Sequence, residues 1–280
     1  MIRDTSIGSR LWRFAIWALV TLFILNLFGI IASVVVNSFA TRWLGTWLPA
    51  GFTNHWYADA WSSFQLGDVV LVTFEIAFAV VVISAIVGVM TAYGLARRKF
   101  LGKRVVMLII LLPLLVPPLT YGIPLATLLY QAGLGSSFWG VVLVNLVPSV
   151  PFVILVMIPF IEQIDPRIEA AARVFGASTF RLFIRILFPL LVPGLLAALL
   201  LVLVRTLAMF ELTFLVSGPS SQTLVVALYY AVFASGVRAG QSIDAMAVVY
   251  MVTTLIWLVL ALQFVSPTQI VARGRNEPAH

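Results

Sequence analysis

Long apolar runs dominate this sequence, and about 20 apolar residues suffice for a helix to cross the hydrocarbon core of a bilayer. Runs of that length occur at residues 14–36, 69–93, 105–130, 138–161, 190–216 and 245–265. Hydrophobic residues make up 62% of the chain, charged residues only 10%, and the mean hydropathy is +1.11. A soluble fold could not bury so large a share of apolar residues. We therefore expect an all-α polytopic membrane protein with six transmembrane helices forming one domain over residues 1–280.

The N-terminal part of the chain raises two questions. The first run follows Arg3, Arg10 and Arg13 as the apolar part of a signal peptide would, but it exceeds the ~7–15 residues of such a segment and no small-residue cleavage site follows. We expect a retained helix. Residues 37–66 are then unusually aromatic, with Trp43, Trp47, Trp56, Tyr57 and Trp61. Such a segment is typical either of an aromatic belt at headgroup level or of a docking surface for an external partner.

Basic residues predict the orientation. Six spans place both tails and residues 97–104 and 165–189 on one side, where 14 of the 17 Lys and Arg residues lie, against Arg42 and Arg238 on the other. By the positive-inside rule that side is the cytoplasm, so we expect a bacterial inner-membrane protein with both termini cytoplasmic. The basic residues are divided among short loops without a continuous groove, which favours contact with membrane lipid over nucleic acid. Residues 223–235, apolar but too short to span, are expected to form an interfacial or re-entrant helix on the outer side.

Prolines concentrate in the third and fourth apolar runs. They are Pro113, Pro117, Pro118, Pro124, Pro148, Pro151 and Pro159. Proline leaves backbone carbonyls unpaired, and a bilayer tolerates these only where protein or a water-filled cavity satisfies them. The pattern fits broken helices that line a pathway, and it also fits helices that are merely kinked inside a bundle.

The most distinctive polar segment is residues 165–189, between the fourth and fifth runs. Asp165 followed by Pro166 is typical of a helix start, because the carboxylate accepts from free amides and proline has no N–H to leave unpaired. Gly176 can adopt the left-handed conformation that ends a helix, and Ser178 can cap a second helix that runs to Phe188. We expect two short helices that form a basic, amphipathic hairpin, which could lie on lipid headgroups or in a groove of a protein partner.

The spacing of Gly176, Ile186 and Pro189 resembles the EAA loop of bacterial ABC-importer permeases. The family glutamate stands six residues before the glycine, where this chain has Ala170, and the glutamate here is one position earlier, at Glu169. One position is a rotation of about 100° around a helix. Phe188 also replaces the family leucine. The similarity extends over roughly residues 68–265 of this sequence.

The resemblance implies a function for the loop and a set of partners. In this family the loop docks in a cleft of the ATP-binding subunit, which makes this segment the ATPase-coupling element; its candidate residues are Glu169, Ala170, Ala171, Gly176, Ile186 and Pro189. A type I importer also implies a pair of ATPase subunits, a second permease or a second copy of this chain, and a periplasmic or extracellular solute-binding protein. ATP and magnesium would then be bound by the ATPase subunits, with no cofactor on this chain.

Motifs for catalysis are missing from the sequence. It has no phosphate-binding loop of the Walker type, since Gly102-Lys103-Arg104 lacks both the first glycine and the hydroxyl residue that binds magnesium. His55 and His280 have no metal-ligand spacing, and there is no cysteine. We therefore expect no catalytic residue, no metal site and no enzymatic activity on this chain.

Charged residues inside the apolar runs are candidates for the substrate pathway, because an ionised side chain at the bilayer centre costs at least ~2.5–3.5 kcal/mol. These residues are Glu75, Arg205 and Glu211, with Tyr121 and Asn145 as neutral candidates at similar depth. One interpretation is a structural ion pair between Arg205 and a glutamate. The other is that these side chains line a translocation cavity.

Some residues of the sequence also indicate a branch of this family. The order of residues 134–178 and the Ser217-Gly218-Pro219 turn resemble the polyamine, opine, phosphonate and iron branch, although Ala208 and Met209 stand near where polyamine permeases carry paired aspartates. A sugar-branch ABC permease is one alternative. An ion-coupled secondary transporter is another, since it would use the same broken helices and buried charges.

Overall fold

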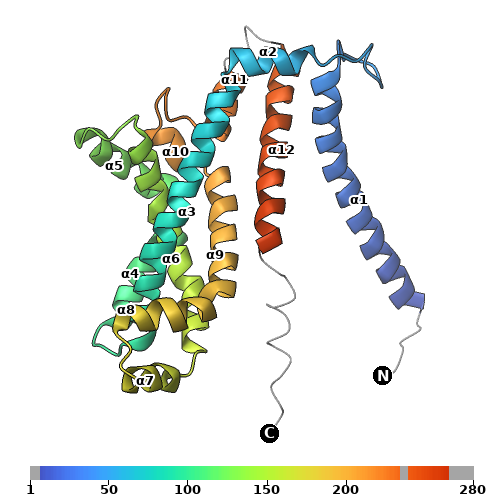
Figure 1. The fold of residues 1–280 in the computed structure, drawn as a ribbon. Helices are drawn as coiled ribbons and strands as arrows, with labels where there is room; N and C mark the ends of the chain where they lie inside the picture. Colours follow the sequence, from blue (N-terminus) through green and yellow to red (C-terminus); the bar gives the residue numbers. More distant parts are fainter. Residues whose placement is uncertain (1–6, 234–238, 265–280) are drawn as a thin grey trace. The chain divides into compact units, whose positions relative to one another are not determined.

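The computed structural model describes residues 7–233 and 239–264, and most of these residues form helices (Figure 1). Their contacts divide the chain into two compact units. Unit 1 comprises the residues up to Gln65 together with Ala231–Met251, and unit 2 comprises Leu66–Tyr230 with the residues from Val252 onward. The N-terminal residues 1–6, Arg238, and the tail containing His280 lie outside the described residues, as do the last two positions of the expected 223–235 segment.

The helices follow one another along the described chain with one isolated β-bridge between Ala40 and Phe52. Their bounds are α1 Ile7–Phe39, α2 His55–Ser63, α3 Leu66–Arg97, α4 Lys103–Leu115, α5 Pro118–Gln131, α6 Phe138–Glu162, α7 Pro166–Val174, α8 Thr179–Leu182, the π-helix η1 Phe183–Leu187, α9 Phe188–Ala208, α10 Glu211–Val216, α11 Leu224–Phe233 and α12 Gly240–Phe264. The expected all-α polytopic fold class is confirmed.

Helices long and apolar enough to cross a membrane lie at the places where the sequence predicts most of the spans. The described residues contain five of them, or six if one bent pair counts as a single span. The expected runs 14–36, 69–93 and 138–161 fall within α1, α3 and α6, and α12 covers 245–264. The tenth and last residue of α11 is Phe233, so the described part of this apolar segment is indeed too short to cross.

The third expected span, residues 105–130, is not one straight helix. It is divided into α4 and α5, whose axes are bent by 98° at a short break. Val116 is extended there, and Pro118 occupies the first turn of α5, where its missing N–H leaves no bond unmade. Because a residue before proline avoids the α conformation, the Pro117-Pro118 pair ends one helix and begins the next.

The fifth expected span, residues 190–216, is not one continuous helix either. Helical hydrogen bonding runs without a gap from Thr179 through η1 to Ala208, and α10 begins separately after an extended Met209. The second helix of the polar segment therefore does not stop at Phe188. The Phe188 amide donates a hydrogen bond of the wider π type to the carbonyl of Phe183. This wider turn helps the helix to continue past Pro189 while its axis changes direction (Figure 1).

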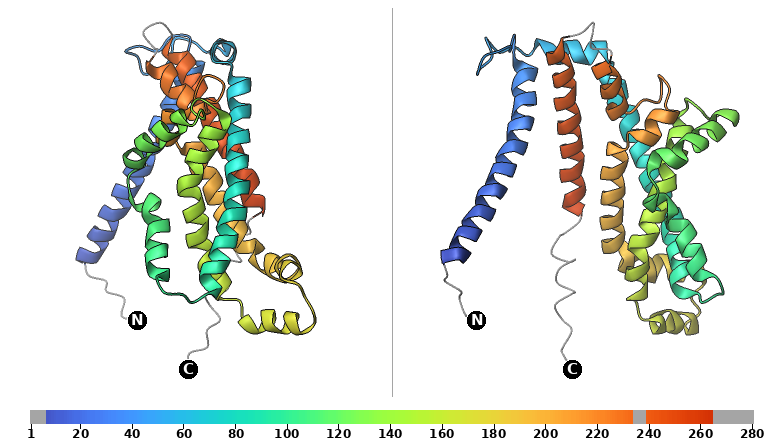
Figure 2. Two further views of the ribbon diagram at one scale, coloured as in Figure 1. Left: turned by 90° about the vertical axis from the view of Figure 1, so that its left-hand side faces the viewer. Right: turned by 180° about the vertical axis from the view of Figure 1, so that it is seen from behind.

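The core of unit 2 lies where α3, α6 and α9 pack against one another (Figure 2). Small residues permit the close approach of α3 to α6: a Cβ atom built on Gly88 would lie 2.6 Å from Val153 Cγ1. Ser84 and Ala92, one turn to either side, are fully buried. A stripe of small residues on α3 is thus a packing surface, as helices in membranes commonly have. A second apolar cluster joins α5, α6 and α10.

Unit 1 contains α1, α2 and the first part of α12. Asn37 on α1 donates a hydrogen bond to Asp244 on α12. The hydroxyl groups of Ser38 and Tyr57 are 2.8 Å apart, which links α1 to α2. The described side chains of α1 before residue 34 are exposed to their surroundings.

Candidate functional site

The polar segment forms the short helix α7 and the start of a long helix, and these begin, with a bend between them, where the sequence predicts. Asp165 caps α7, since its carboxylate accepts a hydrogen bond from the Arg167 amide at 2.9 Å. Gly176 has a φ of +78°, in the left-handed region where glycine avoids the strain that a Cβ atom would cause. Ser178 then caps α8 by accepting from the Arg181 amide. These local signals are confirmed in detail.

The inward side of α7 is held to the end of α3. Glu169 is only 8% exposed, and its carboxylate accepts from Arg97 Nε at 2.7 Å and from the Tyr93 hydroxyl at 2.6 Å. Arg97 also donates through Nη2 to the Ile164 carbonyl at 2.7 Å. One turn along α7, Ala172 joins the core of α3, α6 and α9. Polar and apolar contacts therefore fix the same face of α7.

The outward side of α7 and the bend after it expose apolar surface. Ala170 and Ala171 are exposed, Val174 is 85% exposed, and Phe175 is 90% exposed. Phe180, at the start of α8, is 75% exposed. A cluster of large exposed apolar side chains marks an interaction surface more often than a solvated one. The position that matches the family glutamate, Ala170, thus faces outward, whereas Glu169 faces the core.

The remaining coupling candidates lie beyond the bend. Ile186 is half-buried against the core of unit 2, within η1. Pro189 is exposed in the first turn of α9. These two residues shape the passage from the polar segment into the long helix, at a distance along the chain from the exposed surface of α7.

All five pathway candidates belong to unit 2. Tyr121 on α5 packs against the apolar cluster that includes Met209 and Leu212, and the charges of Arg205 on α9 and Glu211 on α10 act on it from beyond hydrogen-bond distance. Its hydroxyl group is buried and has no hydrogen-bond partner among the described residues. Arg205 is half-buried, and the described residues place no carboxylate within 4.0 Å of it. A structural ion pair of Arg205 with Glu75 or Glu211, one of the two interpretations of these charges, is therefore not formed.

The other two pathway candidates, Asn145 and Glu75, differ in their surroundings. Asn145 is buried and donates from Nδ2 to the Val141 carbonyl at 2.9 Å and to Thr213 Oγ1 at 3.1 Å, which ties α6 to α10. Glu75 is exposed on α3 and forms no ion pair with the described residues. Asn145 thus has a packing role in this state, and Glu75 faces the surroundings of the chain.

Sequence reasoning missed several residues of these sites. Arg97 is one of five basic residues at positions 97–104, and charge alone does not separate it from its exposed neighbours Arg98 and Lys99. Tyr93, four residues earlier, lies on the same side of α3, and this spacing was the available signal. Four aromatic residues also gather between α10 and α11 with ring centroids 4.8–5.9 Å apart; they are Phe210, Phe214, Tyr229 and Tyr230.

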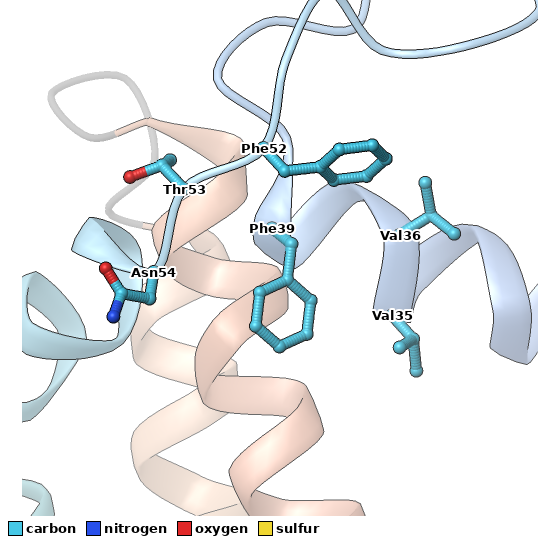
Figure 3. A pocket seen from close by; sticks show the side chains of 6 residues that line it. All are labelled: Val35, Val36, Phe39, Phe52, Thr53 and Asn54. Carbon is cyan, nitrogen blue, oxygen red and sulfur yellow. The ribbon is translucent and has the colours of Figure 1, made fainter.

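The aromatic segment of unit 1 has both packed and exposed members. Trp56 donates from Nε1 to the Ala40 carbonyl at 2.8 Å, whereas Trp47 is 98% exposed. Unit 1 also contains an open, mostly apolar hollow of about 520 Å³ (Figure 3). It is lined by Val35, Val36, Phe39, Phe52, Thr53 and Asn54. None of these side chains is charged, so the hollow offers apolar contact and no acid–base chemistry.

Comparison with known proteins decides the family. The model of the binding-protein-dependent transport system inner membrane component matches residues 84–271. The chain belongs to this family. The permease is therefore a transmembrane subunit of a binding-protein-dependent ABC importer, as its resemblance to the EAA loop indicated.

Individual relatives extend the match beyond that region. The permease is 27% identical over 245 residues to the spermidine/putrescine transport system permease protein PotC of Escherichia coli (strain K12), covering 87% of this chain and 88% of PotC. It is 34% identical over 158 residues to the molybdenum transport system permease protein ModB of Haemophilus influenzae, covering 50% and 69%. The similarity to PotC confirms the predicted resemblance to the branch that includes polyamine permeases.

A solved structure has the same fold. A chain from the crystal structure of a bacterial ABC transporter that imports the acidic polysaccharide alginate superposes with a TM-score of 0.77 at 18% identity. The superposition covers 95% of the permease and all of that chain. The all-α architecture is thus that of an importer permease.

A group of three or more His, Asp or Glu side chains that could hold a metal does not occur in residues 7–233 and 239–264.

Proposed function

We propose that the permease couples ATP hydrolysis on partner subunits to solute import through α7. In this proposal two permease subunits, a second copy of this chain or a related one, form the pathway and two ATPase subunits dock on their cytoplasmic side. A solute-binding protein delivers the solute from outside. ATP and magnesium are bound by the ATPase subunits, this chain carries no catalytic residue, and its single domain spans the inner membrane with both termini in the cytoplasm.

The two-sided character of α7 carries this proposal. One side is anchored by Glu169 and Ala172 to the bundle that crosses the membrane. The other side exposes Val174 and Phe175, which would be unfavourable in water unless a partner covers them. A helix that joins a partner on one side and the bundle on the other can transmit a displacement between them.

The pathway belongs, in our proposal, to the half-buried polar cluster of unit 2. Tyr121, Arg205 and Glu211 offer a hydroxyl group, a cation and a carboxylate that no described side chain pairs at hydrogen-bond distance. Unpaired charged groups inside a membrane mark transport pathways because their burial has to be compensated by water, solute or a moving partner. We include Asn145 and Glu75 as pathway residues of other states of the transport cycle.

The solute is proposed as a small molecule delivered by the binding protein. The names of the relatives cover spermidine and putrescine, molybdenum, and melibiose with raffinose and stachyose. Polyamine permeases carry paired aspartates shortly before the Gly-Pro turn, and this chain has Ala208 and Met209 near those positions. We therefore leave polyamines out of the proposal, and a binding screen on the partner binding protein is the direct way to the solute.

Cysteine cross-linking tests the docking of α7, and the absence of cysteine from the native chain removes background from this subunit. Val174→Cys should form a cross-link to the ATPase subunit, provided with an accessible cysteine in its docking cleft, in membranes that contain the assembled importer. The product is detected by gel mobility and immunoblotting. No knowledge of the solute is needed.

Trp47→Cys is the matched control, because Trp47 is equally exposed but lies in the segment that the sequence places on the outer side. It should give no cross-link to the ATPase. An importer that copurifies with its ATPase, yet shows no cross-link from Val174→Cys or from Phe175→Cys, would remove α7 as the docking helix.

A further inference from the structure

The contact between Glu169 and the end of α3 is the only ion pair among the described residues, and it lies away from the exposed surface of α7. Glu169 receives hydrogen bonds on both carboxylate oxygens, one from Arg97 and one from Tyr93. Both donors belong to the last turns of α3 and are four residues apart, so they stand on one face of that helix. The carboxylate of α7 is therefore clamped by a single face of α3.

Arg97 holds a second acceptor besides Glu169. Its Nε donates to Glu169 while its Nη2 donates to the carbonyl of Ile164, in the connection between α6 and α7. The planar guanidinium group can hold two acceptors in a fixed geometry, which the point charge of a lysine cannot do. One side chain of α3 thus fixes both the start and the side of α7.

Tyr93 connects the clamp to the second helix of the polar segment. Its ring packs edge-to-face against Phe183 of η1, with centroids 6.0 Å apart. Leu182 and Leu187, on either side of Phe183, are buried in the core of α3, α6 and α9. Both helices of the polar segment are therefore attached to the same end of α3.

We propose that Arg97 and Tyr93 are positioning residues that lock α7 to α3 through Glu169, so that a displacement of α7 by the ATPase moves α3 as one rigid body with it. The inference rests on the proposed docking of α7. It assigns Glu169 a role inside the permease, while the exposed residues of α7 contact the ATPase. Charge-assisted hydrogen bonds are shorter and stronger than neutral ones, which suits a joint that has to stay closed while its ends are displaced.

Distance measurements between spin labels test the lock in the assembled importer. Labels on Arg167→Cys in α7 and Ile86→Cys in α3 use two exposed positions of the cysteine-free chain. The labelled importer has to retain its ATPase activity. With the native clamp we expect one narrow distance distribution that is the same without nucleotide and with ATP trapped on a hydrolysis-deficient ATPase.

Variants of the clamp separate positioning from general stability. Glu169→Gln and Arg97→Gln should each broaden the distribution, because an amide has one acceptor oxygen where the carboxylate uses two, and it cannot replace the guanidinium. The charge exchange Arg97→Glu with Glu169→Arg should narrow it in part, since the ion pair is restored but the bond to the Ile164 carbonyl is not. Arg98→Gln, a loss of the same charge at the adjacent exposed position, should leave it unchanged.

Two results would overturn the lock. One is a distribution in assembled Glu169→Gln as narrow as that of the native clamp, and the other is a native distance that shifts when ATP is trapped. The Val174→Cys cross-link is measured on the same backgrounds. If the cross-link forms and the clamp variants leave the distance distribution unchanged, the docking proposal stands and the lock is wrong. If the cross-link is absent when the clamp is native, the docking proposal itself is wrong.

Discussion

At the scale of single residues, the conformation of Gly176 matters more than the space around it. Its φ is +78°, and no heavy atom lies within 4 Å of the position that a Cβ would occupy. A larger side chain therefore meets no clash but does meet backbone strain of roughly 1–2 kcal/mol. The bend between α7 and α8 depends on that backbone conformation.

We expect Gly176→Val to lower the ATPase activity of the assembled importer and its uptake, while the amount of permease in the membrane stays the same. A β-branched residue resists positive φ. Gly176→Asn should retain most of both activities, since asparagine tolerates the left-handed region. Immunoblots of membranes and ATPase assays of the purified importer provide the comparison. Native activity in the valine variant would show that the bend has no part in coupling.

Arg205 is the residue on which the pathway and packing interpretations differ. No described carboxylate pairs with it, so its replacement leaves no uncompensated partner behind. We expect Arg205→Gln to assemble normally and to lose transport, and Arg205→Gln with Glu211→Gln not to recover it. Uptake into proteoliposomes, with the solute found by the binding screen, is measured beside the yield of the importer. Full transport by a well-assembled single variant contradicts the pathway role.

At the scale of elements, the close packing of α3 on α6 sets the spacing of the bundle. A Cβ on Gly88 would lie 2.6 Å from Val153 Cγ1, a distance that requires one helix to move. Gly94, on the same helix, has no neighbour within 4 Å of its Cβ position. Two glycines of one helix thus differ in what they permit.

We expect Gly88→Ala to destabilise the assembled permease by about 1–3 kcal/mol, the usual cost of overpacking a close contact. Gly94→Ala is the control and should not destabilise it. Adding Val153→Ala to Gly88→Ala should recover part of the loss, because it removes the side chain that the new Cβ meets. Thermal unfolding of the purified importer, followed by tryptophan fluorescence or loss of ATPase activity, measures all three. Equal melting temperatures for Gly88→Ala and Gly94→Ala would contradict the packing argument.

At the scale of the whole molecule, the family match and the helical architecture give a membrane subunit, and in the proposed function partner ATPase subunits supply its energy. We expect the purified permease alone to show no ATP hydrolysis, and the importer assembled with its ATPase to show it. Uptake into proteoliposomes should persist when ionophores collapse proton and sodium gradients, because ATP hydrolysis on partner subunits is the proposed source of energy. Uptake by the permease alone that follows an ion gradient would favour the secondary transporter.

Much of the architecture follows from the sequence because local rules decide it. The long apolar runs required helices, since only internal hydrogen bonding satisfies a backbone in lipid. The ends of α7 followed from Asp165, Pro166 and Gly176, whose effects act within one helical turn. The sequence motif around Gly176 also indicated the importer family.

Tertiary structure decided what local rules leave open. No proline or glycine explains why the helix after Arg205 ends at Ala208; Met209 instead packs with Leu212 into the cluster on α5, so packing ends the helix. The two partners of Glu169 lie more than 70 residues away along the chain. Which of several adjacent arginines reaches that carboxylate depends on the rotation of α3 in its bundle. That rotation is a property of packed helices, and the sequence of one helix does not contain it.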